Sequence, residues 1–207
     1  AEARARPLAW WPEHTGMTPA AILDWAQGSD WGEALLRAWS EAFLRQPDPA
    51  WADAFLRRPP LRGFTLDRAQ LLAGLSAPER ESYWCEILGS AAENTRRSAL
   101  FAQITLDFGR DDAAMSEAFA RRMLDEARSL AARASRSERG FFEFHEFARA
   151  LPELAILLPA ACLEDAGRDW PVETSTSAYF SDAVARMFAI FEQRKTLHRL
   201  LRERNAS

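Results

Sequence analysis

The sequence predicts an all-α fold, and three observations support this prediction. Valine occurs only at Val172 and Val184, and no segment alternates apolar and polar residues over the length of a strand. Alanine, leucine, arginine and glutamate, which favour helices, dominate the composition. Capping residues and prolines recur where helices are expected to begin. These features together predict helices along the whole chain.

Four pairs of residues mark helix starts. Thr18-Pro19 and Asp48-Pro49 each place a capping side chain before a proline at the first helical position. Asp30 with Glu33, and Ser76 with Glu79, have the spacing of a capping box. Pro152 lies inside one expected helix and should kink or split it. With the apolar periodicity, these signals predict helices near 19–27, 31–46, 49–58, 66–75, 77–88, 93–107, 112–134, 138–158, 160–166 and 177–204.

The connections between these helices are short, which favours antiparallel helical hairpins in a HEAT/armadillo-like right-handed stack. No linker composition divides the chain, so we expect residues 18–207 to form a single all-helical domain. Residues 1–17 are expected to be an extended lead-in, because Pro12 favours extended backbone at Trp11. The first residues lack the apolar run of a signal peptide. We interpret them as a junction to a missing upstream part.

Composition argues against several classes of protein. No apolar run approaches the roughly 18 to 20 residues that a membrane span needs. Cys85 and Cys162 form no CxxC pair, which argues against zinc and disulfides and favours the cytoplasm. The net charge of −4 makes nucleic acid an unexpected partner. Neither a glycine-rich phosphate loop nor a GxSxG motif is present, so no cofactor is expected.

The three histidines are the candidate centres of acid–base or metal chemistry. Glu13 and His14 are adjacent, but no nucleophile is marked near them, and we interpret them as turn residues. His145 begins an "HEF" sequence, yet position 149 is arginine, so the second histidine of HExxH is missing. His198 falls on an apolar helical stripe and is expected at the edge of the core. The sequence therefore predicts no catalytic and no metal-binding residue.

The eight tryptophans and the arginine-rich end offer surfaces for a partner. Trp25, Trp31 and Trp39 have helical spacing and are expected in the core. Trp10, Trp11 and Trp170 lie beside prolines in expected loops or terminal segments and are either core residues or partner contacts. The arginines of segment 192–204 either contact an acidic partner or complement the helix macrodipole. The candidate partner-binding residues are Trp10, Trp11, Trp170, Arg194, Arg199 and Arg202.

Four segments carry a resemblance to a known family. They are "HTG" before Thr18-Pro19, "DW" with "EALLRAW" over 30–39, "RQPDPAWADAFL" over 45–56, and "FEQRKTLHRLL" over 191–201. The chain resembles the C-terminal part of an uncharacterised bacterial helical-repeat family of unknown function. Members of that family are often encoded beside a MoxR-type AAA ATPase, a von Willebrand factor A protein and a SWIM zinc-finger protein. The resemblance implies a helical scaffold that works with an ATPase-based assembly system.

The expected function is therefore a non-enzymatic α-helical scaffold or protein-interaction module. Its expected partners are a AAA ATPase or a von Willebrand A protein. One alternative is a HEAT-like protein that binds nucleic acid or acts as a DNA glycosylase. A further alternative is a hydrolase that uses His14 or His145.

Overall fold

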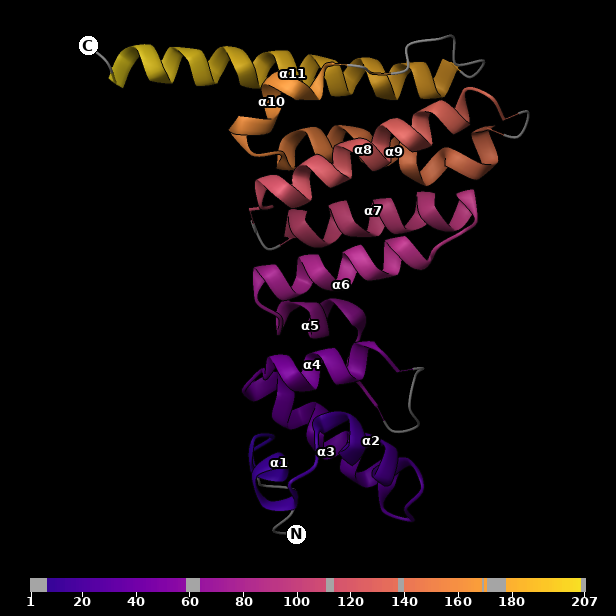
Figure 1. Ribbon diagram of the computed structural model, residues 1–207, viewed down its shortest axis with the longest axis vertical. Helices are drawn as coiled ribbons and strands as arrows, with labels where there is room; N and C mark the ends of the chain where they lie inside the picture. Colours follow the sequence, from indigo (N-terminus) through magenta and orange to yellow (C-terminus); the bar gives the residue numbers. More distant parts are fainter. Residues whose placement is uncertain are drawn as a thin grey trace. The chain divides into compact units, whose positions relative to one another are not determined.

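The computed structural model describes residues 7–58, 64–110, 114–137, 140–168, 170 and 178–205, with the backbone alone at 140–142 and 178–179. Within these ranges every regular element is a helix, and no strand occurs (Figure 1). The all-α prediction is confirmed. Close backbone contacts divide the chain into two compact units, residues 1–80 (unit 1) and 81–207 (unit 2). The single domain expected over 18–207 stays a prediction.

The described part of unit 1 contains five complete helices and the start of α6, and the sequence explains where most of the five begin. Thr18 Oγ1 accepts a hydrogen bond from the Ala21 amide at 3.2 Å, and Asp48 Oδ1 accepts one from the Trp51 amide at 3.1 Å. Both predicted caps are confirmed. The fifth helix starts at a capping box between Asp67 and Gln70, which the sequence analysis above does not predict. The helices are α1 (Trp10–Thr15), α2 (Pro19–Gln27), α3 (Gly32–Arg45), α4 (Pro49–Leu56) and α5 (Arg68–Ala73).

Two sequence predictions about local structure in unit 1 are wrong. Asp30 does not cap α3, because the N-cap is Trp31, whose φ of −95° and ψ of −2° are helical rather than extended. Trp11 is not extended but lies in α1, which ends at Gly16 with a left-handed φ of 67°. Pro12 is tolerated because it lies in the first turn, where the amides have no helical partner.

The core of unit 1 is rich in tryptophan. Trp39 and Trp51 are almost fully buried, and their ring centroids lie 5.2 Å apart. Trp11 packs edge-on against Trp39, with the ring centroids 5.2 Å apart. Trp51 Nε1 donates a hydrogen bond to the carbonyl of Leu8. The first described segment therefore folds back onto α3 and α4.

The prediction that Trp25 and Trp31 are core residues is wrong, whereas that for Trp39 is confirmed. Trp25 is 53% exposed and Trp31 is 73% exposed. The buried side of α2 is formed by small and aliphatic residues instead, and Trp25 falls outside it. Trp31 lies just before the first residue of α3, at the start of the pattern that it shares with Trp39, and its side chain stays in solvent. Tryptophan spacing alone did not decide burial.

Unit 2 is organised around α9. This helix packs against α7, α8 and α11 (Figure 1). It continues as one helix through Pro152, so Pro152 does not split it, and the kink that was the other expectation stays a prediction. The elements are α6 (Ala77–Ser90), which begins in unit 1, then α7 (Asn94–Arg110), α8 (Glu117–Ala134), α9 (Gly140–Leu157), the 3-10 turn η2 (Ala160–Cys162), α10 (Leu163–Ala166) and α11 (Ala178–Asn205).

The ten predicted helices are all present, with ends shifted by a few residues. The largest difference is the start of α8, which begins at Glu117 rather than 112 because Ser116 caps it. Ser116 Oγ accepts a hydrogen bond from the Phe119 amide at 3.2 Å. The helical segment expected at 160–166 is η2 followed directly by α10.

Candidate protein-binding surface

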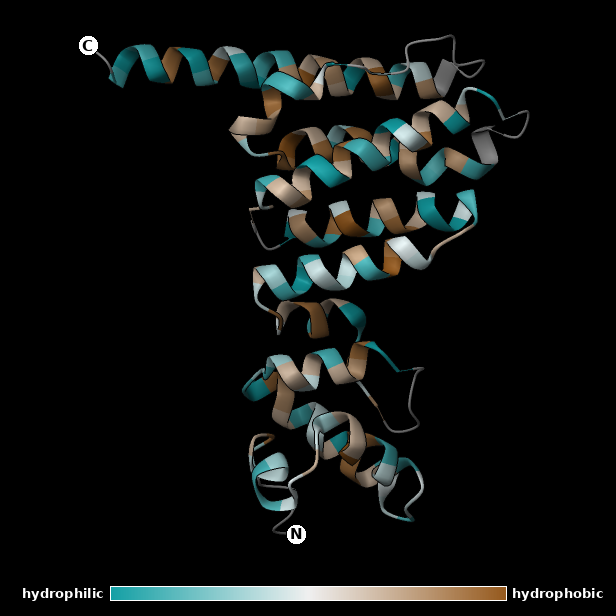
Figure 2. Cartoon of the chain, viewed as in Figure 1, coloured by the Kyte–Doolittle hydropathy of each residue, from teal (hydrophilic) through white to brown (hydrophobic). Residues whose placement is uncertain are grey.

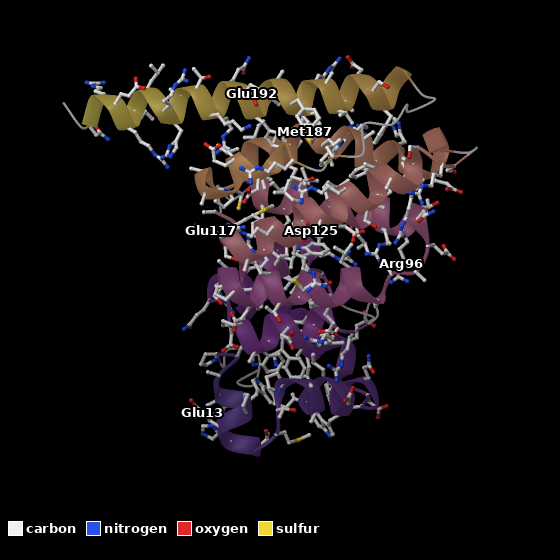
Figure 3. The ribbon with its side chains drawn as sticks, turned by 45° about the horizontal axis from the view of Figure 1, so that its top comes forward. Glu13, Arg96, Glu117, Asp125, Met187 and Glu192 are labelled. Atoms are coloured by element: carbon white, nitrogen blue, oxygen red, sulfur yellow. The ribbon has the colours of Figure 1, made fainter. Side chains whose placement is uncertain are left out.

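α11 is the longest helix, and its two ends have different surroundings. Phe180, Met187 and Phe191 are buried along its first half, and Figure 3 shows Met187 on the side that faces the other helices of unit 2. The C-terminal end extends past α9 and α10 (Figure 1). Its residues alternate between hydrophilic and hydrophobic (Figure 2). One side of this end faces η2 and α10, and most of its other residues are exposed.

Three leucines lie on this free end. Leu197, Leu200 and Leu201 are 59%, 54% and 48% exposed. Their spacing of three and four residues places them on one helix face. A cluster of exposed apolar side chains with a polar rim is typical of an interaction site. These leucines are not among the residues that the sequence marks as candidates, because leucines at helical spacing equally predict a buried stripe.

The candidate arginines have two different roles. Arg194 Nη1 donates to the carbonyls of Ala155 and Leu158, at 2.7 and 2.8 Å, and so caps the C-terminal end of α9. Burial lowers the pKa of Arg194. Arg199 and Arg202 are exposed and make no hydrogen bond or ion pair with any other described residue. These two arginines have the freedom to meet a partner.

A groove of about 330 Å³ lies between the η2–α10 segment and α11. Arg199, Arg202 and the half-buried His198 line it from α11, and Glu164 lines it from α10. Lys195 also lines the groove, but its Nζ pairs with Glu192 at 2.9 Å. Nitrogen-tipped side chains surround the end of α11 (Figure 3). The groove is thus lined by three cationic side chains and two carboxylates, and Glu164 makes no ion pair with any described residue.

A second candidate surface lies across α7, α9 and α11. Cavities of about 500 and 630 Å³ flank α9, one toward α7 and the other toward α11. Arg149 and Glu153 line both cavities. Leu106 and Ile156, each 55% exposed, add apolar area on α7 and α9. We call this surface the three-helix face.

The candidate tryptophans are more enclosed than loop residues. Trp10 is half-buried and stacks on His14, with centroids 4.2 Å apart. Trp11 is half-buried against the core of unit 1. Trp170 is 6% exposed and packs edge-on against Phe188 in unit 2. The six candidate residues therefore belong to separate places in the two units, and their partner contacts stay a prediction.

The remaining titratable groups form no recognisable reaction centre among the residues that the structure describes. His14 Nδ1 lies 2.9 Å from the Trp10 carbonyl, and Glu13 is exposed beside it on α1 (Figure 3). Burial raises the pKa of both Cys85 and Cys162. No group of three potential metal ligands occurs in the described ranges.

No described helix is long and apolar enough to cross a membrane. The described ranges thus define an all-α protein with two exposed candidate surfaces, the three-helix face and the end of α11. Residues 2–201 match the family of unknown function DUF5691, and the chain belongs to that family. Comparisons with curated proteins and with solved structures find no match. The resemblance to a family of unknown function is confirmed, while the gene neighbours and the bacterial origin stay predictions.

Proposed function

We propose that this chain is a non-enzymatic α-helical module that binds other proteins. The observation that carries the proposal is the three-helix face, where two cavities flank one exposed edge of α9. Arg149, Glu153, Asp182 and Arg186 line it with charges of both signs. A face with charges of both signs and exposed aliphatic side chains is typical of surfaces that bind another protein. Proteins that bind the phosphate backbone of nucleic acid instead have a uniformly basic groove.

The arrangement of helices in unit 2 supports a HEAT- or armadillo-like architecture for this module. α9 packs between α7 and α11, while α8 packs against α9 and η2. In helical-repeat proteins one layer of helices forms an extended binding surface. The three-helix face corresponds to such a layer in this proposal.

The proposed partner is a component of an ATPase-based assembly system in the bacterial cytoplasm. The support is the family resemblance carried by segments 30–39, 45–56 and 191–201. A MoxR-type ATPase or a von Willebrand A protein would then be held by the scaffold rather than modified by it. No cofactor or metal is needed for this role.

Photo-crosslinking of the whole chain in its native host tests the proposal. A photo-reactive amino acid replaces Leu106, which is exposed beside the cavity between α7 and α9. We expect a protein crosslink, identified by mass spectrometry, that Arg149→Glu weakens because this residue lines both cavities. Among the described residues Arg149 makes only an exposed 3.7 Å ion pair, with Glu146, so the substitution should leave folding intact.

The matched control is Arg96→Glu, an equivalent charge reversal at an exposed arginine of α7 (Figure 3). The crosslink should survive this change. Recovery of DNA with repair enzymes, or a crosslink unaffected by Arg149→Glu, would contradict the proposal. Thermal unfolding of each variant shows that the fold is retained.

A further inference from the structure

We infer that the cavity between α9 and α11 binds a large apolar side chain of a partner protein, next to a lysine or arginine that pairs with Glu153. This cavity has a volume of about 630 Å³ and belongs to the three-helix face. We call it the α9–α11 cavity. The inference rests on the proposed function, because it names the chemistry that the same face recognises. Different variants test the two proposals.

The bottom of the α9–α11 cavity is apolar. α9 packs against α11 (Figure 1), and small side chains leave a space between the two helices. Ala148 and Pro152 line this space from α9. Ala183 and Ala189 line it from α11. Ala148 and Ala183 are 1% and 8% exposed, so core residues form the bottom of the cavity. An apolar side chain that enters the cavity exchanges water for these groups, as the anchor residues of protein interfaces do.

Charged side chains form another part of the same lining. Arg149 and Glu153 belong to α9, and Asp182 and Arg186 belong to α11. Both arginines already have a partner: Arg149 lies 3.7 Å from Glu146, and Arg186 lies 2.9 Å from Asp182. Glu153 is exposed and makes no ion pair or hydrogen bond with any other described residue. The unpaired charge in this lining is therefore a carboxylate.

Charge complementarity then decides what lies beside the apolar side chain. The charged groups just named are two arginines and three carboxylates, a net charge of −1. Glu153 and the apolar groups line one cavity, so a single partner segment can contact both. Glu153 also lines the cavity between α9 and α7, which places its carboxylate beside both cavities of the face. A lysine or arginine of the partner would supply the missing positive charge.

The same carboxylate disfavours other occupants. In a two-fold symmetric contact centred on the α9–α11 cavity, Glu153 of one copy would face Glu153 of the other. The phosphates of nucleic acid would meet an unpaired negative charge, and so would the headgroups of an anionic lipid surface. A basic segment of a different protein avoids all three conflicts.

Phage display of random linear peptides tests the inference on the full 207-residue chain. We expect the wild-type protein to select peptides that place a large apolar residue close to a lysine or arginine. Ala189→Trp should weaken these peptides at least about tenfold, because the indole fills the space that the apolar residue needs. Ala189 is exposed, so this change should leave the core intact. The matched control is Ala185→Trp, at an exposed alanine of α11 outside the cavity lining, and it should bind as wild type does.

Charge reversal gives the sharper result. Glu153→Lys should weaken the selected peptides about fivefold, because an attraction becomes a repulsion. Replacing the lysine or arginine of a selected peptide by glutamate should then restore its binding to this variant. The matched control is Glu164→Lys, at an exposed glutamate of α10 that makes no ion pair with any described residue. This control should bind the original peptides as wild type does.

Several outcomes would overturn the inference. They are a failure to select peptides, selected peptides that lack a basic residue, unchanged binding by Ala189→Trp or Glu153→Lys, and a dimer in light scattering that Ala189→Trp abolishes. Circular dichroism checks the fold of each variant, and if Ala189→Trp does not fold, Glu153→Lys decides alone. If the inference fails while the Leu106 crosslink persists and still depends on Arg149, the proposed function stands. Loss of that crosslink result as well would overturn both.

Discussion

Single side chains in this protein show how polar groups are satisfied inside a helical core. Trp84 is 1% exposed, and its Nε1 donates to Asp107 Oδ2 at 2.9 Å. This bond joins α6 to α7 within unit 2. Loss of a hydrogen bond to a buried carboxylate lowers the stability of the fold, because water cannot replace the missing donor.

Trp84→Phe should lower the free energy of unfolding by about 3 kcal/mol, from the lost hydrogen bond and the space left by the smaller ring. Urea unfolding followed by circular dichroism measures this change. Trp25→Phe is the matched control, since Trp25 is 53% exposed, and should stay within about 0.5 kcal/mol of wild type. Equal losses at both positions would contradict the burial described for them.

Glu79 offers a prediction about pH. Hydrogen bonds from the Ser76 hydroxyl at 2.6 Å and the Ser76 amide at 2.9 Å hold the pKa of Glu79 below its ordinary value of 4.5. The half of the predicted capping box in which Glu79 accepts a hydrogen bond from the Ser76 amide is thus confirmed. A carboxylate with a depressed pKa in the folded state stabilises that state above its unfolded pKa.

The stabilising contribution of Glu79 should be complete at neutral pH and disappear as the pH falls below 4.5 through the lowered pKa. Carbon-13 NMR titration of the carboxyl group measures this pKa directly. Ser76→Ala should raise the pKa toward 4.5, because the hydroxyl donor is removed. A pKa at or above 4.5 in the wild-type chain would contradict the hydrogen bonds described here.

At the scale of elements, side chains that reach across helices matter more than local ion pairs. Arg97 Nε donates to Glu126 Oε1 at 2.7 Å and so connects α7 to α8, with both side chains largely buried. The hydrogen bond that Arg97 donates to Glu126 raises the pKa of Arg97. Arg194 similarly connects α11 to the end of α9. Exposed pairs within one helix contribute less than about 0.5 kcal/mol each.

Arg194→Met should destabilise the protein by about 1 to 2 kcal/mol, because it leaves the Ala155 and Leu158 carbonyls without a donor while keeping an apolar stem. Hydrogen exchange should quicken in the last turn of α9. Arg199→Met is the control and should change stability by less than about 0.5 kcal/mol, since Arg199 has no described partner. A large effect of Arg199→Met would mean that its guanidinium is structurally engaged.

At the scale of the whole molecule, the boundary between the two units falls inside α6. A helix that contributes residues to both units links their unfolding, because its backbone hydrogen bonds form cooperatively. We therefore expect one unfolding transition for the chain. Six of the eight tryptophans lie in unit 1, so fluorescence reports mainly on that unit.

Tryptophan fluorescence and circular dichroism should give coincident urea transitions. Trp84→Phe, a change in unit 2, should shift both midpoints equally. Hydrogen exchange with mass spectrometry assigns the transition to peptides of each unit. Two separate transitions would show that the units are independent domains and would contradict the expected single domain.

The sequence alone determined the helices and most of their starts. Periodicity and capping are local properties, so Thr18 and Asp48 cap the predicted helices. The prediction that Asp30 caps α3 is wrong, because Trp31 is the N-cap and has helical backbone angles. The local sequence pattern did not indicate these angles.

Tertiary structure decided which side chains are buried and which are free. Trp39 is buried while Trp31 is exposed, although both belong to one periodic pattern, because only Trp39 meets the rings of Trp11 and Trp51. Arg194 caps α9 because the fold places the end of α9 against it, whereas Arg199 of the same helix is exposed. A sequence pattern fixes the side of a helix on which a residue lies, but burial depends on what the fold brings against that side.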